Sequence, residues 1–140
     1  MTLYLETSAL LAWVLGEPAG ARVRNVLAHA DLVTTSALTV VEAERVFVRL
    51  VATRIMSEVD AADCRSVLAS VVPGWTIIGL DSAILDRARK PFPEEPVRTL
   101  DALHLVSALV ARAAVPGLSV LSLDARVRTN AAALGFPVVP

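Results

Sequence analysis

The sequence predicts a single α/β domain in which a mostly parallel five-stranded sheet is covered by helices on both faces. Short apolar runs alternate with amphipathic segments along the whole chain, and this order is typical of such a fold. The apolar runs are continuous, as expected for strands that are buried on both faces. The chain has 140 residues, of which 55% are hydrophobic and 4% aromatic, so it can bury one core of small aliphatic side chains. We therefore expect one domain over residues 1–140.

The first half of the chain contains two of the expected strands. After the first strand, Thr7 and Ser8 supply hydroxyl groups that can cap a helix, and residues 16–18 (Gly-Glu-Pro) end that helix. Ser36 can cap a long helix with one apolar stripe, and Ser57 opens a capping-box pattern. The expected elements are strands at residues 3–5 and 32–35 and helices at residues 9–15, 19–30, 37–54 and 57–72.

The second half continues the same alternation. Residues 73–74 (Pro-Gly) stop the fourth helix, and three prolines within residues 91–96 mark the one clear loop. Thr99 can cap the next helix, residues 116–117 (Pro-Gly) end it, and Gly135 is a C-terminal stop for the last helix. The expected elements are strands at residues 75–80, 118–123 and 136–139 and helices that start near residue 82 and at residues 100–114 and 125–134.

Charge and composition exclude several classes of function. The net charge is -1, from 13 basic and 14 acidic residues, so the chain lacks the global basic field of tight non-specific nucleic-acid binding. Cys64 is the only cysteine, which excludes an internal disulfide and a multi-cysteine zinc site. No apolar run reaches the ~18 residues that cross a bilayer, and no Gly-rich phosphate loop is present. We expect a cytoplasmic protein without a membrane segment or a nucleotide cofactor.

Four acidic residues fall where an α/β sheet can build a site. Ligands bind beyond the carboxyl ends of parallel strands, and Glu6 and Asp124 follow the first and fourth strands. Asp101 lies in the first turn of a helix that is apolar on almost every side, so its buried charge needs compensation. Glu42 can reach the site from a neighbouring helix. Mg²⁺ and Mn²⁺ prefer oxygen ligands, so we predict that these acids hold one or two such ions for phosphate chemistry.

Each acid also has a structural interpretation that the sequence leaves open. Glu6 can be a turn residue after a strand, and Asp124 can simply cap the last helix. Glu42 lies opposite the main apolar stripe of its helix, beside Arg45 and Arg49, so it can form a solvated ion pair. No single acid decides between these interpretations and a metal site.

Basic residues near the later acids are candidates for substrate binding. Arg98 precedes the helix of Asp101 and can either neutralise that acid or contact a phosphate of the substrate. Arg126 or Arg128 can contact phosphates after the fourth acid, and all three arginines can equally be ordinary surface residues. His104 lies on the same helix face as Asp101, and core packing is its simpler interpretation.

The four acids lie in four longer segments, and together these segments resemble one protein family. The segments are YLETSALLAWVLGEP, TTSALTVVEAERVF, RTLDALHLVSAL and SVLSLDARVRTNAAALGFPV. In this order and with these separations, they resemble the PIN-domain ribonucleases, most closely the VapC-type toxins of bacterial toxin–antitoxin pairs. The resemblance covers nearly the whole chain.

The resemblance implies a PIN domain with a five-stranded parallel sheet and a metal-dependent endoribonuclease activity that leaves a 5′-phosphate and a 3′-hydroxyl on RNA. It also implies a homodimer, and a cognate antitoxin whose tail occupies the active-site groove. Glu42, Asp101 and Asp124 match the second, third and fourth acids of the family's metal site. Ser122 matches the hydroxyl residue before the fourth acid, and we group it with the substrate-binding candidates.

Glu6 departs from the family pattern, which has aspartate in the first acidic position. The extra methylene moves the carboxylate roughly 1.5 Å further from the backbone, and a misplacement of about 1 Å can cost of order 100-fold in rate. The alternative is therefore a catalytically weakened PIN domain that binds RNA or an antitoxin. A receiver-like phosphotransfer domain is a third possibility, but it needs a late lysine, and the only lysine is Lys90 in the proline-rich loop.

Overall fold

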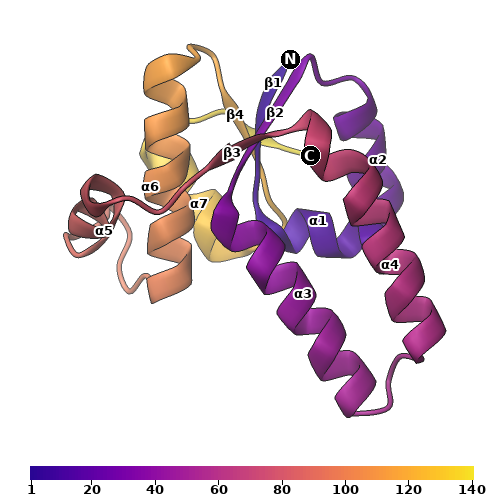
Figure 1. Cartoon of the computed structure of the whole chain (residues 1–140). Coiled ribbons are helices and arrows are strands. Elements are labelled where there is room, and N and C mark those ends of the chain that lie inside the picture. Colours follow the sequence, from indigo (N-terminus) through magenta and orange to yellow (C-terminus); the bar gives the residue numbers. More distant parts are fainter.

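A parallel sheet of five strands, in the order β3-β2-β1-β4-β5, forms the centre of the molecule (Figure 1). The computed structural model describes residues 1–140, and every pair of neighbouring strands is parallel. The sheet and its direction confirm the predicted fold class. The strands are β1 (Thr2–Leu5), β2 (Leu32–Ser36), β3 (Thr76–Ile78), β4 (Ser119–Leu121) and β5 (Val138–Val139).

Helices cover both faces of this sheet, as predicted, and each face has its own core. Side chains alternate across a strand, so Leu3 and Leu5 pack with the first four helices, whereas Tyr4 packs with the last three. No helix is of a length and apolarity that would let it span a membrane. The helices are α1 (Thr7–Val14), α2 (Gly20–Ala28), α3 (Ala37–Ala52), α4 (Glu58–Val71), α5 (Ser82–Ala88), α6 (Thr99–Ala114) and α7 (Ala125–Ala133), and η1 (Val72–Gly74) is a 3-10 turn.

The strand order places a topological switch point at the carboxyl ends of β1 and β4. From β1 the chain goes to β2 on one side and returns much later to β4 on the other side. This reversal is the point at which open α/β sheets bind ligands. Leu5 is the register partner of Leu121, so the residues that follow them, Glu6 and Ser122, leave the sheet side by side.

Several element boundaries differ from those that the sequence predicts, and local hydrogen bonds explain the differences. The helix predicted at residues 9–15 starts at Thr7, because the Glu6 carboxylate accepts the backbone N–H of Ser8 and caps α1. The expected caps at Thr7 and Ser8 were therefore wrong. Thr99 is the first residue of α6 and not its cap. Gly135 ends α7 with a φ of 85°, which confirms the predicted stop.

The contact between α1 and α2 requires a glycine at the start of α2. A Cβ atom on Gly20 would overlap the backbone carbonyl of Ala12, and a backbone atom cannot rotate away. We expect Gly20→Ala to lower the free energy of unfolding by about 1–3 kcal/mol, measured by urea denaturation. Gly74→Ala is the matched control, because a Cβ atom there meets open space. An equal effect of both substitutions would contradict the prediction.

Candidate functional site

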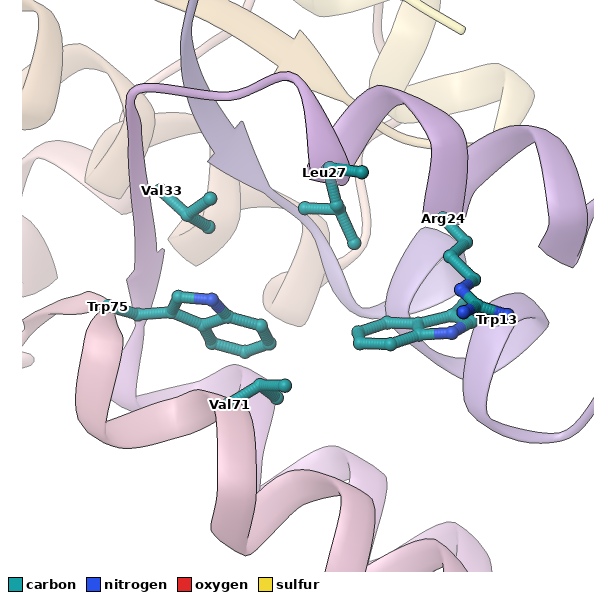
Figure 2. A pocket seen from close by; sticks show the side chains of 7 residues that line it. Trp13, Arg24, Leu27, Val33, Val71 and Trp75 are labelled. Atoms are coloured by element: carbon teal, nitrogen blue, oxygen red, sulfur yellow. The ribbon is translucent and has the colours of Figure 1, made fainter.

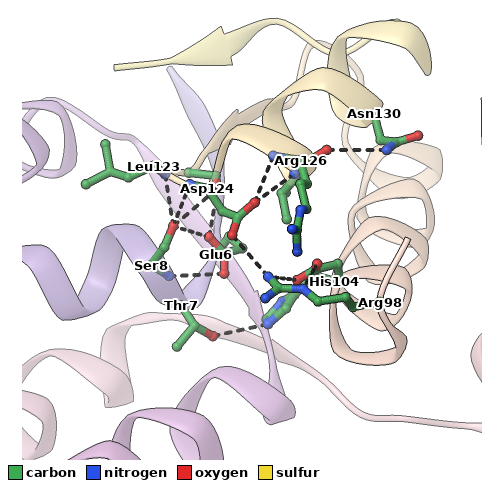
Figure 3. A network of polar contacts seen from close by, with 12 residues as sticks. Glu6, Thr7, Ser8, Arg98, His104, Leu123, Asp124, Arg126 and Asn130 are labelled. Atoms are coloured by element: carbon green, nitrogen blue, oxygen red, sulfur yellow. Dashed lines mark hydrogen bonds and ion pairs between the residues drawn. The ribbon is translucent and has the colours of Figure 1, made fainter. Parts of the chain in front are cut away.

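The structure places all four predicted acids near the carboxyl edge of the sheet. Glu6 follows β1, Glu42 projects from α3, Asp101 lies in the first turn of α6, and Asp124 caps α7. Figure 3 shows the polar network that connects this region. Acids that are up to 118 positions apart in the chain therefore lie at the same edge of the sheet.

Glu6 is held by three hydrogen-bond donors. Its Oε1 accepts the backbone N–H of Ser8 at 3.0 Å, and its Oε2 accepts the hydroxyl of Ser122 at 2.7 Å and the hydroxyl of Ser8. The Ser8 oxygen in turn accepts the backbone N–H groups of Leu123 and Asp124 (Figure 3). Glu6 is 5% exposed, so its carboxylate is fixed rather than mobile. These contacts join the end of β1 to the start of α7.

Asp101 and Asp124 share one positive charge, that of Arg98. Arg98 Nε lies 2.8 Å from Asp101 Oδ2, and its Nη2 lies 3.3 Å from Asp101 Oδ1 and 3.1 Å from Asp124 Oδ2. Asp101 is buried, and the guanidinium of Arg98 neutralises its charge, as the sequence predicts for a buried carboxylate. The hydrogen bond and charge of Asp101 raise the pKa of Arg98. Both sequence interpretations of Arg98 remain available, because 58% of its side chain is exposed.

Asp124 has two roles at once, one for each carboxylate oxygen. Oδ1 accepts the backbone N–H groups of Arg126 and Val127 and so caps α7, as the structural interpretation predicts. Oδ2 accepts a hydrogen bond from Arg98 Nη2 at 3.1 Å. Capping therefore does not exclude a function for this acid, and it fixes the direction of the second oxygen.

Glu42 contacts a buried histidine and not the neighbouring arginines. His104 Nε2 lies 2.6 Å from Glu42 Oε1, and Thr7 donates its hydroxyl to the same oxygen at 2.6 Å. Glu42 forms no ion pair with Arg45 or Arg49, so the solvated-pair interpretation is wrong. Burial raises the pKa of Glu42, but the hydrogen bonds from His104 and Thr7, with nearby positive charge, outweigh burial and lower it.

Because this pKa is lowered on folding, ionised Glu42 stabilises the protein. The contribution is present above the ordinary value of 4.5 and is lost as the pH falls through the lower folded value. In EDTA, we expect the loss of unfolding free energy below about pH 4.5 to be smaller for Glu42→Gln than for the parent. Urea denaturation across this range measures the difference, with the exposed Glu17→Gln as control. Parallel curves for the parent and Glu42→Gln would rule out the effect.

The other candidates divide into exposed and structural residues. Arg126 is exposed and can reach a ligand, whereas Arg128 Nη1 donates to the backbone carbonyls of Ser122 and Val139 at 2.7 and 3.1 Å. The alternative phosphate contact of Arg128 was therefore wrong, because its guanidinium braces the ends of β4 and β5. Ser122 is fully buried, and its hydroxyl donates to Glu6.

Sequence reasoning missed several residues that hold the acids. Ser8 and Thr7 were interpreted only as caps, and His104 was assigned to core packing, although each touches a candidate acid. The available signal was spacing: His104 is one helical turn after Asp101, and the two hydroxyl residues directly follow Glu6.

The donor atoms of the site suit a hard cation, but the site is arranged around Arg98. No three histidine, cysteine, aspartate or glutamate side chains are placed to hold one ion together. All predicted ligand atoms are carboxylate oxygens, which Mg²⁺ and Mn²⁺ prefer. Two of these oxygens, on Asp101 and Asp124, lie within 3.3 Å of one guanidinium nitrogen. The pair thus already binds one positive charge, and a cation there would replace Arg98.

One hollow lies beside this site, and another lies away from it. The hollow beside Glu42 measures about 480 Å³ and is also lined by Arg45 and Arg49. A second cavity of about 250 Å³ lies between Trp13 and Trp75, with Arg24 as its only charged lining residue (Figure 2). This second cavity contains no acid, so it is unsuited to holding a metal ion.

The chain is similar to a known protein family and to several solved structures. A family model described as PIN domain matches residues 3–133. A comparison with curated protein sequences finds no match. Solved structures with a similar fold include PAE2754 from Pyrobaculum aerophilum, which has 18% sequence identity and a TM-score of 0.63, with 99% of this chain and 83% of that chain covered.

Two further solved structures have a similar fold. One is Mycobacterium tuberculosis VapC20, described as a sarcin-ricin loop cleaving toxin, with 18% identity, a TM-score of 0.66 and coverage of 96% of this chain and 95% of that chain. The other is VapBC2 from Rickettsia felis, bound to a DNA fragment from its promoter, with 11% identity, a TM-score of 0.65 and coverage of 99% and 98%. At these identities the likeness concerns the fold.

Proposed function

The chain belongs to the PIN domain family, and from this premise we propose that it is a metal-dependent endoribonuclease toxin of the VapC type, neutralised by a cognate antitoxin. The observation that carries the proposal is the placement of the four acids: Glu6 and Asp124 follow the neighbouring strands β1 and β4, and Glu42 and Asp101 lie on α3 and α6. Two of them, Asp101 and Asp124, already share one cationic group. The description of VapC20 as a toxin that cleaves RNA supports the choice of substrate.

Glu6, Glu42, Asp101 and Asp124 are the proposed ligands of Mg²⁺ or Mn²⁺, and their carboxylates would have to rearrange around the ion, because no three of them are placed to hold one together in this structure. When bound, such an ion would stabilise negative charge on the scissile phosphate and activate a water molecule for attack. Binding of the ion requires Arg98 to leave the two aspartates. The guanidinium is then free at the rim of the site, because most of its side chain is already exposed.

The protein's own contribution is to bind and orient RNA. Arginine binds phosphate oxygens in a fixed fork geometry, so Arg98 and the exposed Arg126 are the proposed contacts for phosphates that flank the scissile bond. Arg45 and Arg49 line the hollow beside Glu42, and they extend the basic surface on the other side. This local arrangement suits a chain whose net charge is only -1.

An antitoxin and a second copy of the chain are the proposed protein partners. The description of VapBC2 as a complex supports the antitoxin. For the homodimer, Val41 and Val48 form an exposed apolar stripe on α3, next to the exposed Leu100. The apolar residues within 67–72, at the end of α4, are largely covered. Light scattering after size exclusion measures the oligomeric state. We also propose that the protein cleaves RNA in the cytoplasm.

The first test of the function is cleavage of a structured RNA by the purified protein. We expect cleavage with Mn²⁺ that stops when EDTA is added in excess. The new RNA ends should carry 5′-phosphate and 3′-hydroxyl groups, which end-labelling detects. Absence of cleavage with Mn²⁺ or Mg²⁺, by a folded protein freed of antitoxin, would argue against the proposal.

The second candidate function is a weakened PIN domain that acts by binding RNA or antitoxin. Glu6 favours it, because its carboxylate is occupied by three protein donors and is longer than the family's aspartate. Our proposal predicts that Glu6→Asp raises the cleavage rate by no more than about tenfold. A gain of about 100-fold, the size expected from correcting a 1 Å misplacement, would favour the weakened domain instead.

A further inference from the structure

A buried network of four residues lies behind the acidic site and ends on Glu42. Tyr4 comes from β1, Thr7 from α1, Glu42 from α3 and His104 from α6. Tyr4 Oη lies 2.9 Å from His104 Nδ1, and His104 Nε2 lies 2.6 Å from Glu42 Oε1 and 3.1 Å from Thr7 Oγ1. Tyr4 and His104 are each 1% exposed. The link between Tyr4 and His104 is therefore shielded from bulk water.

The hydrogen-bond partners determine where the protons lie. His104 Nε2 lies against the Glu42 carboxylate, which can only accept, so the proton of the neutral ring is on Nε2. His104 Nδ1 is then an acceptor for the buried Tyr4 hydroxyl, 2.9 Å away. Ser107 and the backbone of Ser36 are further hydrogen-bond partners of that hydroxyl. Tyr4 therefore donates to His104, and His104 donates to Glu42.

The same network leaves the two oxygens of Glu42 in different environments. Oε1 accepts from both His104 and Thr7, whereas Oε2 has no hydrogen bond within the protein. The side chain of Glu42 remains 22% exposed, while that of His104 is 1% exposed. The carboxylate is thus anchored by one oxygen from the core side, and the other oxygen is available to a ligand.

We propose that His104, with its ring proton on Nε2, is a positioning residue that fixes Glu42 so that Oε2 is presented to the metal ion. This inference rests on the proposed function, because it assigns Glu42 to the metal site. Partners that orient metal-binding side chains typically contribute 10–100-fold to metal affinity or activity. His104 contacts neither RNA nor metal in this scheme, and it acts only through Glu42.

Two substitutions at position 104 separate positioning from packing. His104→Asn places an amide near the former Nδ1, so it can still bond Tyr4 but cannot reach Glu42. His104→Gln places an amide N–H near the former Nε2, so it can still donate to Glu42. We expect the Asn variant to weaken Mn²⁺ binding by about 10–100-fold, and the Gln variant to recover most of that loss. Val106→Ala, a buried packing change on the same helix, controls for destabilisation.

Calorimetric titration with Mn²⁺ provides the affinities, and nitrogen NMR of the histidine ring reports the tautomer without any metal. We expect the Nε2–H form in the parent at pH 7.5. Equal Mn²⁺ affinities for the parent and His104→Asn, or an Nδ1–H tautomer in the parent, would overturn this inference alone. A folded parent that binds no Mn²⁺ would overturn the proposed function and this inference with it.

Discussion

Asp101→Asn is expected to reduce Mn²⁺-dependent RNA cleavage by at least about 100-fold, the size of losing one essential electrostatic contact in an active site. Asparagine has nearly the same shape as aspartate but carries no charge, so it binds a divalent cation poorly. Asp101 is buried at the first turn of α6, and its charge is balanced only by Arg98. No other acid can move into that position without unfolding the helix.

Single-turnover cleavage of a structured RNA measures the loss. Circular dichroism melting confirms that the variant is folded. Asp86→Asn is the matched control, because Asp86 is an exposed acid on α5 that also pairs with an arginine. Equal cleavage by the parent and Asp101→Asn would remove Asp101 from the catalytic site.

Arg98→Gln is expected to change metal binding and cleavage in opposite directions. The guanidinium competes with a cation for Asp101 and Asp124. Its removal should raise the affinity for Mn²⁺ by about tenfold, since unit charges about 4 Å apart interact by about 1 kcal/mol in water and more strongly in protein. Cleavage should nevertheless fall by about 10–100-fold, because RNA loses a phosphate contact.

Calorimetry and single-turnover cleavage on the same preparation provide both values. Arg89→Gln is the control, as Arg89 is an exposed arginine with an aspartate partner on α5. If Arg98→Gln bound Mn²⁺ no more tightly than the parent, Arg98 would be a permanent part of the site and not a competitor of the metal. A variant that gained both affinity and rate would show that Arg98 only inhibits.

The fold was predictable because hydrophobic patterning carries most of its information. Continuous apolar runs such as residues 3–5 and 118–123 identify strands that are buried on both faces, and β1 and β4 lie within these runs. Strand ends were less predictable. The fourth strand stops at Leu121, because Ser122 and Asp124 turn their polar groups to Ser8 and Glu6, and such contacts depend on segments that are distant in sequence.

The acids of the site were predictable as a group, but their individual contacts were not. Helical periodicity placed Glu42 on the polar face of its helix beside two arginines, and it could not show that α6 supplies His104 to that face. Arg128 is the converse case. Its position after Asp124 suggested a ligand contact, yet the C-terminal strand offers it backbone carbonyls. Tertiary packing decides both cases, and local sequence contains neither partner.

The central claim is that these carboxylates form one binding site for a divalent cation, and calorimetric titration of the metal-free protein with Mn²⁺ tests it most directly. We predict saturable binding that Mg²⁺ displaces and that Asp101→Asn and Asp124→Asn each weaken by more than about tenfold. Binding that is absent from the folded parent, or that is unchanged in both variants, would contradict the claim.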